Sequence, residues 1–256
     1  AVDAAPVGPL GLARDRRWML VDAEGVALTQ RELPALVRFA TALVGDDAVR
    51  VTAPDGASCA VPPAAPGAPR RRVRLFGDTI DAAVVDPALD AWFSTRLGVP
   101  CTLVHLPDDV VRPVDPAYAD ADDRAAFSDG YPVLVATEAS LADLNARLAA
   151  QGAPPVTMAR FRPKVVLAAD APAYAEAAGS SLFLRDGDDA VRLALVKPCA
   201  RCAVTTVDPD TAERGVEPLR TLAAYRKVGT KVLFAQNALV RAPGVARLGA
   251  PATAWA

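Results

Sequence analysis

The residues best suited to chemistry are two cysteines three positions apart, Cys199 and Cys202, with Arg201 directly before the second. They stand in the run Lys-Pro-Cys-Ala-Arg-Cys-Ala-Val-Thr-Thr-Val-Asp-Pro, residues 197–209. A cysteine thiolate is both a nucleophile and a ligand for soft metals, and a neighbouring guanidinium favours the anionic form. The run therefore indicates either a metal site or a reactive thiol.

Two interpretations of the pair need partners from outside the run. A thioredoxin-like dithiol would need a helix that starts at the pair, whereas the β-branched residues after Cys202 predict a strand over residues 202–207. A zinc site would need two further ligands, which Cys101 and His105 could supply from one face of a distant strand. The sequence favours neither of them.

Two other interpretations need no distant partner. Burial in the core is the default for any cysteine, and it is expected for Cys59 and Cys101 and is an option for Cys199. In the last interpretation a single thiolate of the pair holds a soft metal, with Arg201 beside it to favour the anion. Because His105 is the only histidine, a mechanism that needs a histidine base together with histidine ligands is excluded.

The composition restricts the class of protein. Of 256 residues 52% are hydrophobic and 23% are charged, which is typical of a globular chain. The net charge of -2 removes the general attraction to phosphate on which nucleic-acid-binding proteins depend. No apolar stretch approaches the roughly 20 residues that span a bilayer, and the first ten residues lack the basic start of a secretory signal. Four unevenly placed cysteines indicate a reducing compartment. We therefore expect a cytoplasmic protein that binds neither nucleic acid nor membrane.

The elements that must position these side chains are mainly short strands with a few helices, an α+β arrangement. The predicted strands cover residues 17–21, 37–44, 48–52, 70–76, 132–136, 163–167, 191–196, 202–207 and 231–240. Five prolines and two glycines predict a loop over residues 54–69. The arginines of residues 70–76 are interpreted as the solvated face of an edge strand rather than as a binding patch.

Three helices are predicted. One opens at Asp86 and is closed by Gly98. A second covers residues 140–148, with Ser140 and Asp143 at the spacing of a capping box. A third covers residues 217–227.

The acidic segment Asp115–Asp129 lacks the ligand order and the glycine of a calcium loop, so it is interpreted as a solvated connector between two halves. The sequence contains no phosphate-binding glycine loop, dinucleotide fingerprint or nucleophile elbow.

Motifs along nearly the whole chain resemble one family in the same order. They are residues 11–22, 137–145, 160–163 and 198–202, followed by Thr-Thr-Val-Asp-Pro-Asp-Thr at 205–211 and Glu-Pro-Leu-Arg-Thr-Leu at 217–222. The family is the MOSC family, and within it the mitochondrial amidoxime reducing component and its bacterial homologues. The resemblance implies an N-terminal β-barrel domain over residues 1–112 and a β-barrel-like MOSC domain over residues 113–256, with a pterin molybdenum cofactor between them.

The resemblance also implies roles for particular residues. Cys202 matches the molybdenum ligand, and Arg201 would lie beside the metal. Arg16 and Arg162 match positions that bind the phosphate and pterin of the cofactor. Members of the family reduce N-hydroxylated compounds. This chain has neither the cysteine spacing of an iron–sulfur protein nor a flavin fingerprint, so an external electron-donor protein is expected.

Two departures from the family pattern affect the cofactor pocket. The family begins with a strand that carries Pro-Val-Lys-Ser, whereas the residues before Gly11 contain neither lysine nor serine, either because residues have been removed or because the strand is absent. The asparagine of the Arg-Pro-Asn motif is Lys164 here, and we expect its ammonium to restore positive charge to the pocket.

Three functions are therefore compared. The leading one is a molybdenum-dependent oxidoreductase that reduces N–O bonds with Cys202 as ligand. In the second, a MOSC-fold protein without molybdenum uses Cys202 as a nucleophile or sulfur carrier, with a pKa lowered by Arg201. The third is a non-catalytic binding module in which both cysteines are packed. Asp208 is a candidate proton donor only by proximity, and a turn with Pro209 is the simpler interpretation.

Overall fold

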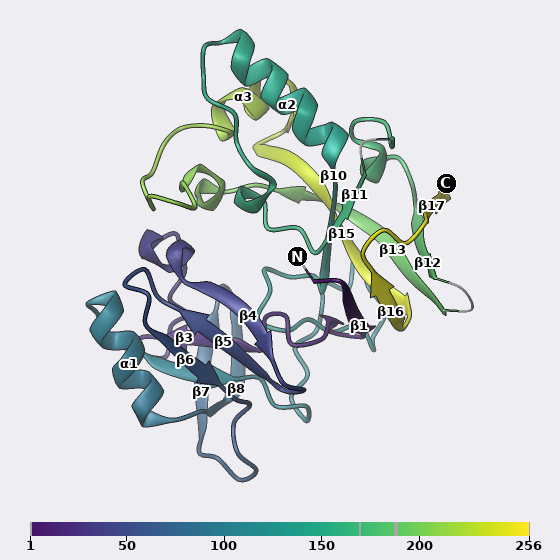
Figure 1. Ribbon diagram of the computed structural model, residues 1–256. Coiled ribbons are helices and arrows are strands. Elements are labelled where there is room, and N and C mark those ends of the chain that lie inside the picture. The colour runs from purple at the N-terminus through teal and green to yellow at the C-terminus, as the bar shows by residue number, and fades with distance from the viewer. Residues whose placement is uncertain (1, 169, 187–188, 256) are drawn as a thin grey trace.

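The computed structural model describes residues 2–168, 170–186 and 189–255. The described part is built mainly from strands, with three α-helices, which confirms the predicted class. Figure 1 shows two lobes, one formed by the purple to blue part of the chain and the other by its green and yellow part.

The N-terminal lobe contains two antiparallel sheets and one helix. The first sheet consists, in spatial order, of β3 (Trp18–Val21), β9 (Thr102–His105), β8 (Asp78–Val84) and β7 (Arg70–Leu75). The second consists of β4 (Ala40–Val44), β5 (Ala48–Thr52) and β6 (Ser58–Val61). Helix α1 (Pro87–Leu97) joins them in one core, where Leu20, Val51 and Phe93 are buried together.

Helix α1 begins and ends where the sequence predicts. The Asp86 carboxylate accepts a hydrogen bond from the Ala88 amide at 2.8 Å, which satisfies a free N–H at the start of the helix. Gly98 ends the helix with φ of 70°, a left-handed conformation that glycine adopts without steric cost.

The C-terminal lobe is formed around one larger sheet. Its strands, in spatial order, are β11 (Val165–Leu167), β10 (Val133–Thr137), β15 (Lys231–Ala242), β13 (Asp189–Ala200), β12 (Ser181–Asp186) and β17 (Ala252–Trp255), with β14 (Lys227–Val228) paired to β15. Helices α2 (Glu138–Ala150) and α3 (Leu219–Tyr225) lie together at the far end of this lobe (Figure 1). They share a core in which Leu144, Leu222 and Phe234 are fully buried.

The first strand crosses to the C-terminal lobe. Strand β1 (Ala4–Gly8) pairs with β2 (Gly11–Leu12) and with β16 (Gly244–Arg247), and Val7 packs into the core of the large sheet. The N-terminus lies beside that lobe in Figure 1. A strand is thus formed before Gly11, so the interpretation that the first strand is absent is wrong, although β1 carries neither lysine nor serine. The domain boundary between residues 112 and 113 stays a prediction.

Two predictions for the N-terminal lobe need correction. The loop predicted over residues 54–69 contains strand β6, because the prolines flank the short Ser-Cys-Ala-Val segment instead of interrupting it. Residues 37–38 belong to a 3₁₀ turn, η1 (Pro34–Arg38), and the hairpin strand starts only at Ala40. Proline at the start of the turn favours this conformation because its φ is fixed.

The strand predicted over residues 202–207 is also wrong. Strand β13 ends at Ala200, and Ala203–Thr206 form a 3₁₀ turn, η4. The hydroxyls of Thr205 and Thr206 donate to the carbonyl oxygens of Cys202 and Ala203 at 3.0 and 2.8 Å. Threonine side chains that bond to the backbone three residues before them stabilise a turn in place of an extended strand.

The cap predicted for the second helix is one turn too late. Thr137 is the N-cap of α2, and its hydroxyl accepts from the Ser140 amide at 3.0 Å. Ser140 lies within the helix, where its buried hydroxyl donates to the Glu176 carboxylate at 3.1 Å. Helix α3 lies inside the range predicted for the third helix and is shorter.

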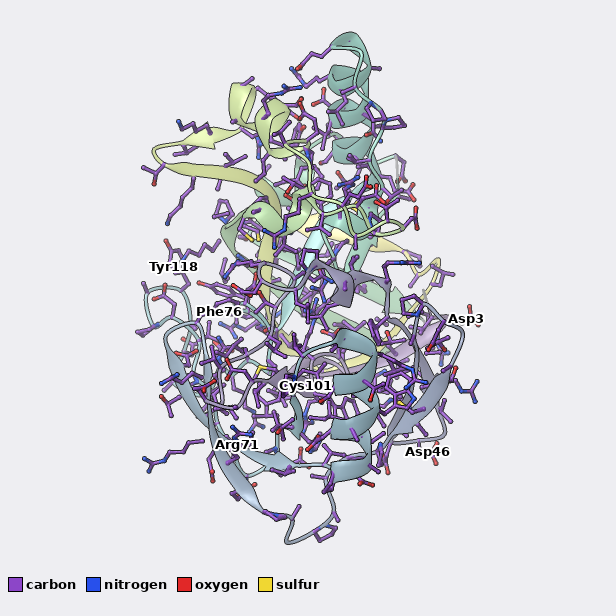
Figure 2. All side chains as sticks on the ribbon, turned by 90° about the vertical axis from the view of Figure 1, so that its left-hand side faces the viewer. Asp3, Asp46, Arg71, Phe76, Cys101 and Tyr118 are labelled. Atoms are coloured by element: carbon purple, nitrogen blue, oxygen red, sulfur yellow. The ribbon has the colours of Figure 1, made fainter. Side chains whose placement is uncertain are left out.

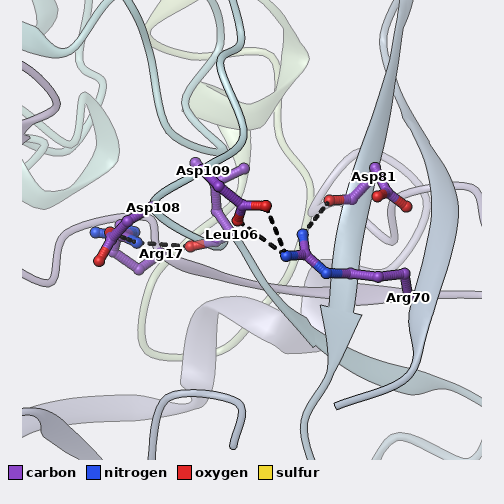
Figure 3. A network of polar contacts seen from close by, with 6 residues as sticks. All are labelled: Arg17, Arg70, Asp81, Leu106, Asp108 and Asp109. Atoms are coloured by element: carbon purple, nitrogen blue, oxygen red, sulfur yellow. Dashed lines mark hydrogen bonds and ion pairs between the residues drawn. The ribbon is translucent and has the colours of Figure 1, made fainter. Parts of the chain in front are cut away.

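The arginine-rich strand β7 is an edge strand, as predicted. Arg70 donates to both carboxylate oxygens of Asp109 at 2.9 Å and to the backbone oxygen of Asp81 at 3.4 Å (Figure 3). Arg17, on the neighbouring part of the lobe, donates to Asp108 at 2.7 Å in the same view. Acidic side chains therefore account for Arg70 and Arg17 without a ligand.

The acidic connector is held to the C-terminal lobe by ion pairs. Asp120 and Asp123 lie 3.2 and 2.6 Å from Arg241, and Asp115 lies 3.2 Å from Lys197. Within the described ranges no three His, Cys, Asp or Glu side chains gather as a metal ion would require. None of the helices described is both long enough and apolar enough to cross a bilayer.

Candidate functional site

Cys202 is presented between the lobes. It follows the end of β13 and precedes η4, and its side chain is half-buried. Its Sγ accepts a hydrogen bond from Nη2 of Arg31 at 3.5 Å, and Arg31 belongs to the N-terminal lobe. Burial alone would lower the pKa of the Arg31 guanidinium, but the hydrogen bond to Cys202 and the charges of Cys202 and Asp129 raise it. The thiol is thus accessible and lies beside a fixed positive charge.

Arg201 contacts the other cysteine of the motif. Its Nη1 donates to Cys199 Sγ at 2.9 Å and its Nη2 to the Phe161 carbonyl at 2.8 Å. Burial raises the pKa of the Cys199 thiol, although Arg201 opposes the shift. Cys199 is therefore a protonated, packed thiol, and the arginine that contacts Cys202 is Arg31 rather than Arg201. A cofactor-binding role for Arg201 stays a prediction.

The two other interpretations of the cysteines can now be judged. Cys101 is buried in the N-terminal core with its thiol 3.5 Å from the Ser94 hydroxyl, and the ring of His105 lies 5.2 Å from that of Trp18. Neither side chain reaches the Cys199–Cys202 run, so the zinc interpretation is wrong. The sequence spoke against a thioredoxin-like dithiol because it predicted a strand after Cys202. That argument fails, because a 3₁₀ turn follows Cys202.

Lys164 and Asp15 form an ion pair at the junction. The Lys164 ammonium lies 3.0 Å from an oxygen of Asp15, and the lysine side chain is only 9% exposed. Burial lowers the pKa of Lys164, and Asp15 opposes that shift while Arg16 and Arg162 add to it. Lys164 does lie among the predicted cofactor residues, but a carboxylate of this chain already offsets its charge.

Arg16 and Arg162 complete the positive cluster. Arg16 lies 3.7 Å from Asp15, and both arginines adopt a left-handed backbone conformation with φ of 57°. Such a conformation is uncommon for a residue with a side chain and is concentrated at functional sites. Burial and, second to it, the charge of Arg16 together lower the pKa of Arg162 to about 9. The structure thus brings Arg16, Arg162 and Lys164 together around Asp15.

Arg162 and Lys164 line a cavity of about 1580 Å³. It lies between strand β1, the hairpin β4–β5 and strand β11, with Asp15 in its wall. Arg162 has a large solvent-exposed surface, and it also has enough protein atoms around it for burial to lower its pKa. Cys202 and Arg201 do not line the cavity. The predicted site therefore has two parts, a thiol at the lobe junction and the pair Arg162 and Lys164 in a cavity wall that also carries acidic residues and that Arg16 does not line.

These residues fit an anionic cofactor. Arg162 has no ion pair among the described residues, and the Nε of Arg201 is buried without a hydrogen-bond partner. The charge of Arg201 also reaches Arg162 and lowers its pKa, so the two parts of the site are electrostatically connected. Guanidinium groups that repel one another and keep unpaired N–H donors are suited to a phosphate.

The Asp208 carboxylate is held in a turn. Its Oδ1 accepts from the amides of Asp210 and Thr211 at 2.9 and 3.0 Å, and its Oδ2 accepts from Arg160 at 2.7 Å. The two amide hydrogen bonds lower the pKa of Asp208. The interpretation as a turn is confirmed.

Sequence reasoning missed Arg31, Asp15 and Asp129. Arg31 lies 171 positions from Cys202, and nothing in the chain around it marks it as a partner of a thiol. Asp15 directly precedes Arg16, so their proximity could be read from the sequence. The contact between Asp15 and Lys164 could not be predicted. Asp129 stands at the end of the acidic connector, and its charge acts on Arg31, Arg162 and Cys199.

Comparison with known proteins identifies both lobes. The model of the MOSC N-terminal beta barrel domain matches residues 1–100, and that of the MOSC domain matches residues 122–253. Human mitochondrial amidoxime-reducing component 1 is 34% identical over 94% of this chain and 73% of its own length. The mouse protein of the same name is 33% identical over 94% and 72%. Molybdenum cofactor sulfurase of tomato is 28% identical over 91% of this chain but only 30% of its own length.

Proposed function

This chain belongs to the MOSC family, and on that basis we propose that it is a molybdenum-cofactor oxidoreductase that reduces the N–O bond of N-hydroxylated compounds. The relatives support a function related to the molybdenum cofactor, and those named amidoxime-reducing components support an oxidoreductase. The observation that carries the proposal is the half-buried Cys202 thiol at the lobe junction, at the position that matches the family's metal ligand.

The residues of the chain would share the work between the two parts of the site. Cys202 would hold the metal through its sulfur, and Arg31 would keep a hydrogen bond to that sulfur. Arg16, Arg162 and Lys164 would bind the anionic part of the cofactor, with Arg201 between the two parts. When bound, the cofactor supplies the two-electron chemistry that cleaves the N–O bond.

Electrons would come from an external donor protein, since no iron–sulfur or flavin motif is present in the sequence. The donor and the cytoplasmic location remain predictions.

The test is metal content combined with activity. Protein produced in a host that makes the cofactor should contain molybdenum and, once reduced with dithionite, should convert a simple N-alkylhydroxylamine to the amine. Cys202→Ala should abolish the activity. Cys59→Ala, a matched change in the N-terminal core, should keep it. Protein that folds in such a host without molybdenum would contradict the proposal.

A metal-free function for Cys202 is the second candidate. The thiol is accessible beside Arg31, which suits a nucleophile or sulfur carrier, and the tomato sulfurase is among the relatives. Metal analysis separates the two candidates, because only the first requires molybdenum.

A further inference from the structure

The N-terminal lobe delivers one cation directly to the reactive sulfur. Arg31 lies in the segment between β3 and η1, and its Nη2 donates to Cys202 Sγ at 3.5 Å. No other hydrogen bond to its guanidinium is found in the described part of the chain, although a guanidinium carries five N–H donors. Since the side chain is only half-buried, the remaining donors are open to a small molecule that reaches the sulfur.

The guanidinium is held in place by groups that do not neutralise it. Its carbon lies 4.8 Å from the centre of the Phe76 ring. The Arg31 carbonyl accepts a hydrogen bond from the Arg214 side chain, and its amide donates to Thr29 Oγ1 at 3.1 Å. The two backbone contacts fix the start of the side chain and the ring supports its end, so Arg31 is anchored without an ion pair to any carboxylate of the described residues.

Phe76 supports the Arg31 guanidinium from an exposed position. It lies at the turn between β7 and β8 with 47% of its surface exposed and with φ of 55°. A large apolar side chain gains nothing by exposure, and a left-handed backbone is unfavourable for it. Figure 2 shows Phe76 at the level where the two lobes meet. Supporting Arg31 at the lobe junction accounts for both features.

The charges around the sulfur favour an anion. The Arg31 guanidinium donates to Cys202 Sγ, and the Arg214 guanidinium, from the opposite lobe, donates to the backbone carbonyl of Arg31. The acidic groups whose charge acts on Arg31 are Asp129 and Glu32, both exposed to solvent, where water screens them.

From this geometry we propose that Arg31, supported by Phe76, is an anion-recognition residue at Cys202 and directs the site towards N-hydroxylated substrates that carry a carboxylate. The choice of substrate rests on the proposed function. The preference for an anion at the sulfur does not, because it depends only on residues of this chain.

A metal-free chemical probe tests the anion preference. The Cys202 sulfur attacks the methylene carbon of iodoacetate or iodoacetamide, the S–C bond forms, the C–I bond breaks and iodide leaves. Both reagents react with the same thiolate, so its abundance cancels from the ratio of the two rates. The ratio is measured on the Cys202 peptide by mass spectrometry, which separates it from the other three cysteines.

Arg31→Gln should lower the iodoacetate-to-iodoacetamide ratio by about fivefold, the effect of one nearby charge in water. Arg31→Lys should keep most of the ratio. Phe76→Leu should lower it in part, and this exposed position secures the test if Arg31→Gln fails to fold. Arg38→Gln, an equal charge change at an exposed site of η1, should leave the ratio unaltered. Equal ratios in the parent chain, Arg31→Gln and Phe76→Leu would show that Arg31 only ties the lobes together.

A second measurement separates this inference from the proposed function. In molybdenum-loaded protein, Arg31→Gln should raise KM for a carboxylate-bearing hydroxamate by about fivefold, with little change for a neutral hydroxylamine. If the loaded protein reduces neither compound while the alkylation ratio depends on Arg31, the N–O reductase function is wrong and the anion site stands. If both compounds lose activity equally, substrate selection by Arg31 is wrong.

Discussion

Removing the carboxylate of Asp15 should cost more stability than removing the ammonium of Lys164. The two groups are 3.0 Å apart, and the lysine side chain is 9% exposed against 33% for the aspartate. Asp15→Asn leaves a nearly buried ammonium among arginines with no counter-charge. Breaking a buried pair in this way costs about 3–5 kcal/mol, and the partial exposure of Asp15 reduces the expectation to about 2 kcal/mol.

Lys164→Met removes the buried charge itself. Asp15 then keeps Arg16 at 3.7 Å and its access to water, so the expected cost is at most about 1 kcal/mol. The double variant should cost less than the sum of the single ones, with a coupling free energy of about 1–2 kcal/mol. Both single variants change one charge at one junction, so each serves as the matched control of the other.

Urea unfolding of the four proteins at pH 7 and moderate salt provides the free energies of unfolding. Phosphate sharpens the test, because an anion can replace the missing carboxylate and should stabilise Asp15→Asn more than the parent chain. Equal losses for the two single variants, or a coupling below about 0.3 kcal/mol, would refute the view that Asp15 neutralises Lys164.

Three further outcomes are expected. Burial, aided by the charge of Arg17, lowers the pKa of His105 to about 4. Between pH 6.5 and 4 the imidazole is therefore protonated in the unfolded chain and neutral in the folded chain. Stability should therefore fall by about 2 kcal/mol between pH 6.5 and 4, and His105→Gln should flatten that part of the urea stability profile. Asp208→Asn should keep kcat within about twofold, since Oδ1 still accepts the turn amides; a hundredfold loss would restore it as a proton donor. Gly11→Ala should destabilise by at least about 2 kcal/mol in urea, because its Cβ would lie 2.4 Å from the Pro132 oxygen at φ of 88°; a neutral effect would place these lobe contacts in doubt.

Local signals in the sequence were sufficient for the helices and failed for the short turns. Asp86 and Gly98 act on their own neighbours in the chain, so α1 could be predicted from them. The conformation after Cys202 was decided by hydrogen bonds of the threonine hydroxyls, whereas the β-branched side chains alone predict a strand. Propensity is a weak signal where a side chain can bond to its own backbone.

The candidate site divides in the same way. The motif around Cys202 and the arginines at positions 16 and 162 could be chosen from the sequence, because the resemblance concerns residue types in order. The atoms that each side chain contacts could not be predicted from the sequence. Arg201 lies next to Cys202 in the chain but donates to Cys199, and the contact to Cys202 comes from Arg31 in the other lobe. Such pairings depend on how the lobes pack, and no spacing in the chain encodes them.

The segment that carries both Arg16 and Arg31 explains why the N-terminal lobe is needed at all. Strand β3 lies between the two arginines and is fixed by pairing with β9, so one short stretch of chain places a cation at each part of the site. The cost is the burial of charge and, second to it, mutual repulsion; both lower the pKa of Arg162, and the charges of Asp129 and Asp15 offset only part of the shift. An anion bound in the cavity would relieve the rest. Binding of an anion should therefore stabilise the fold, whereas variants that remove these cations should gain stability and lose ligand affinity, since the groups that oppose folding are those that attract the ligand.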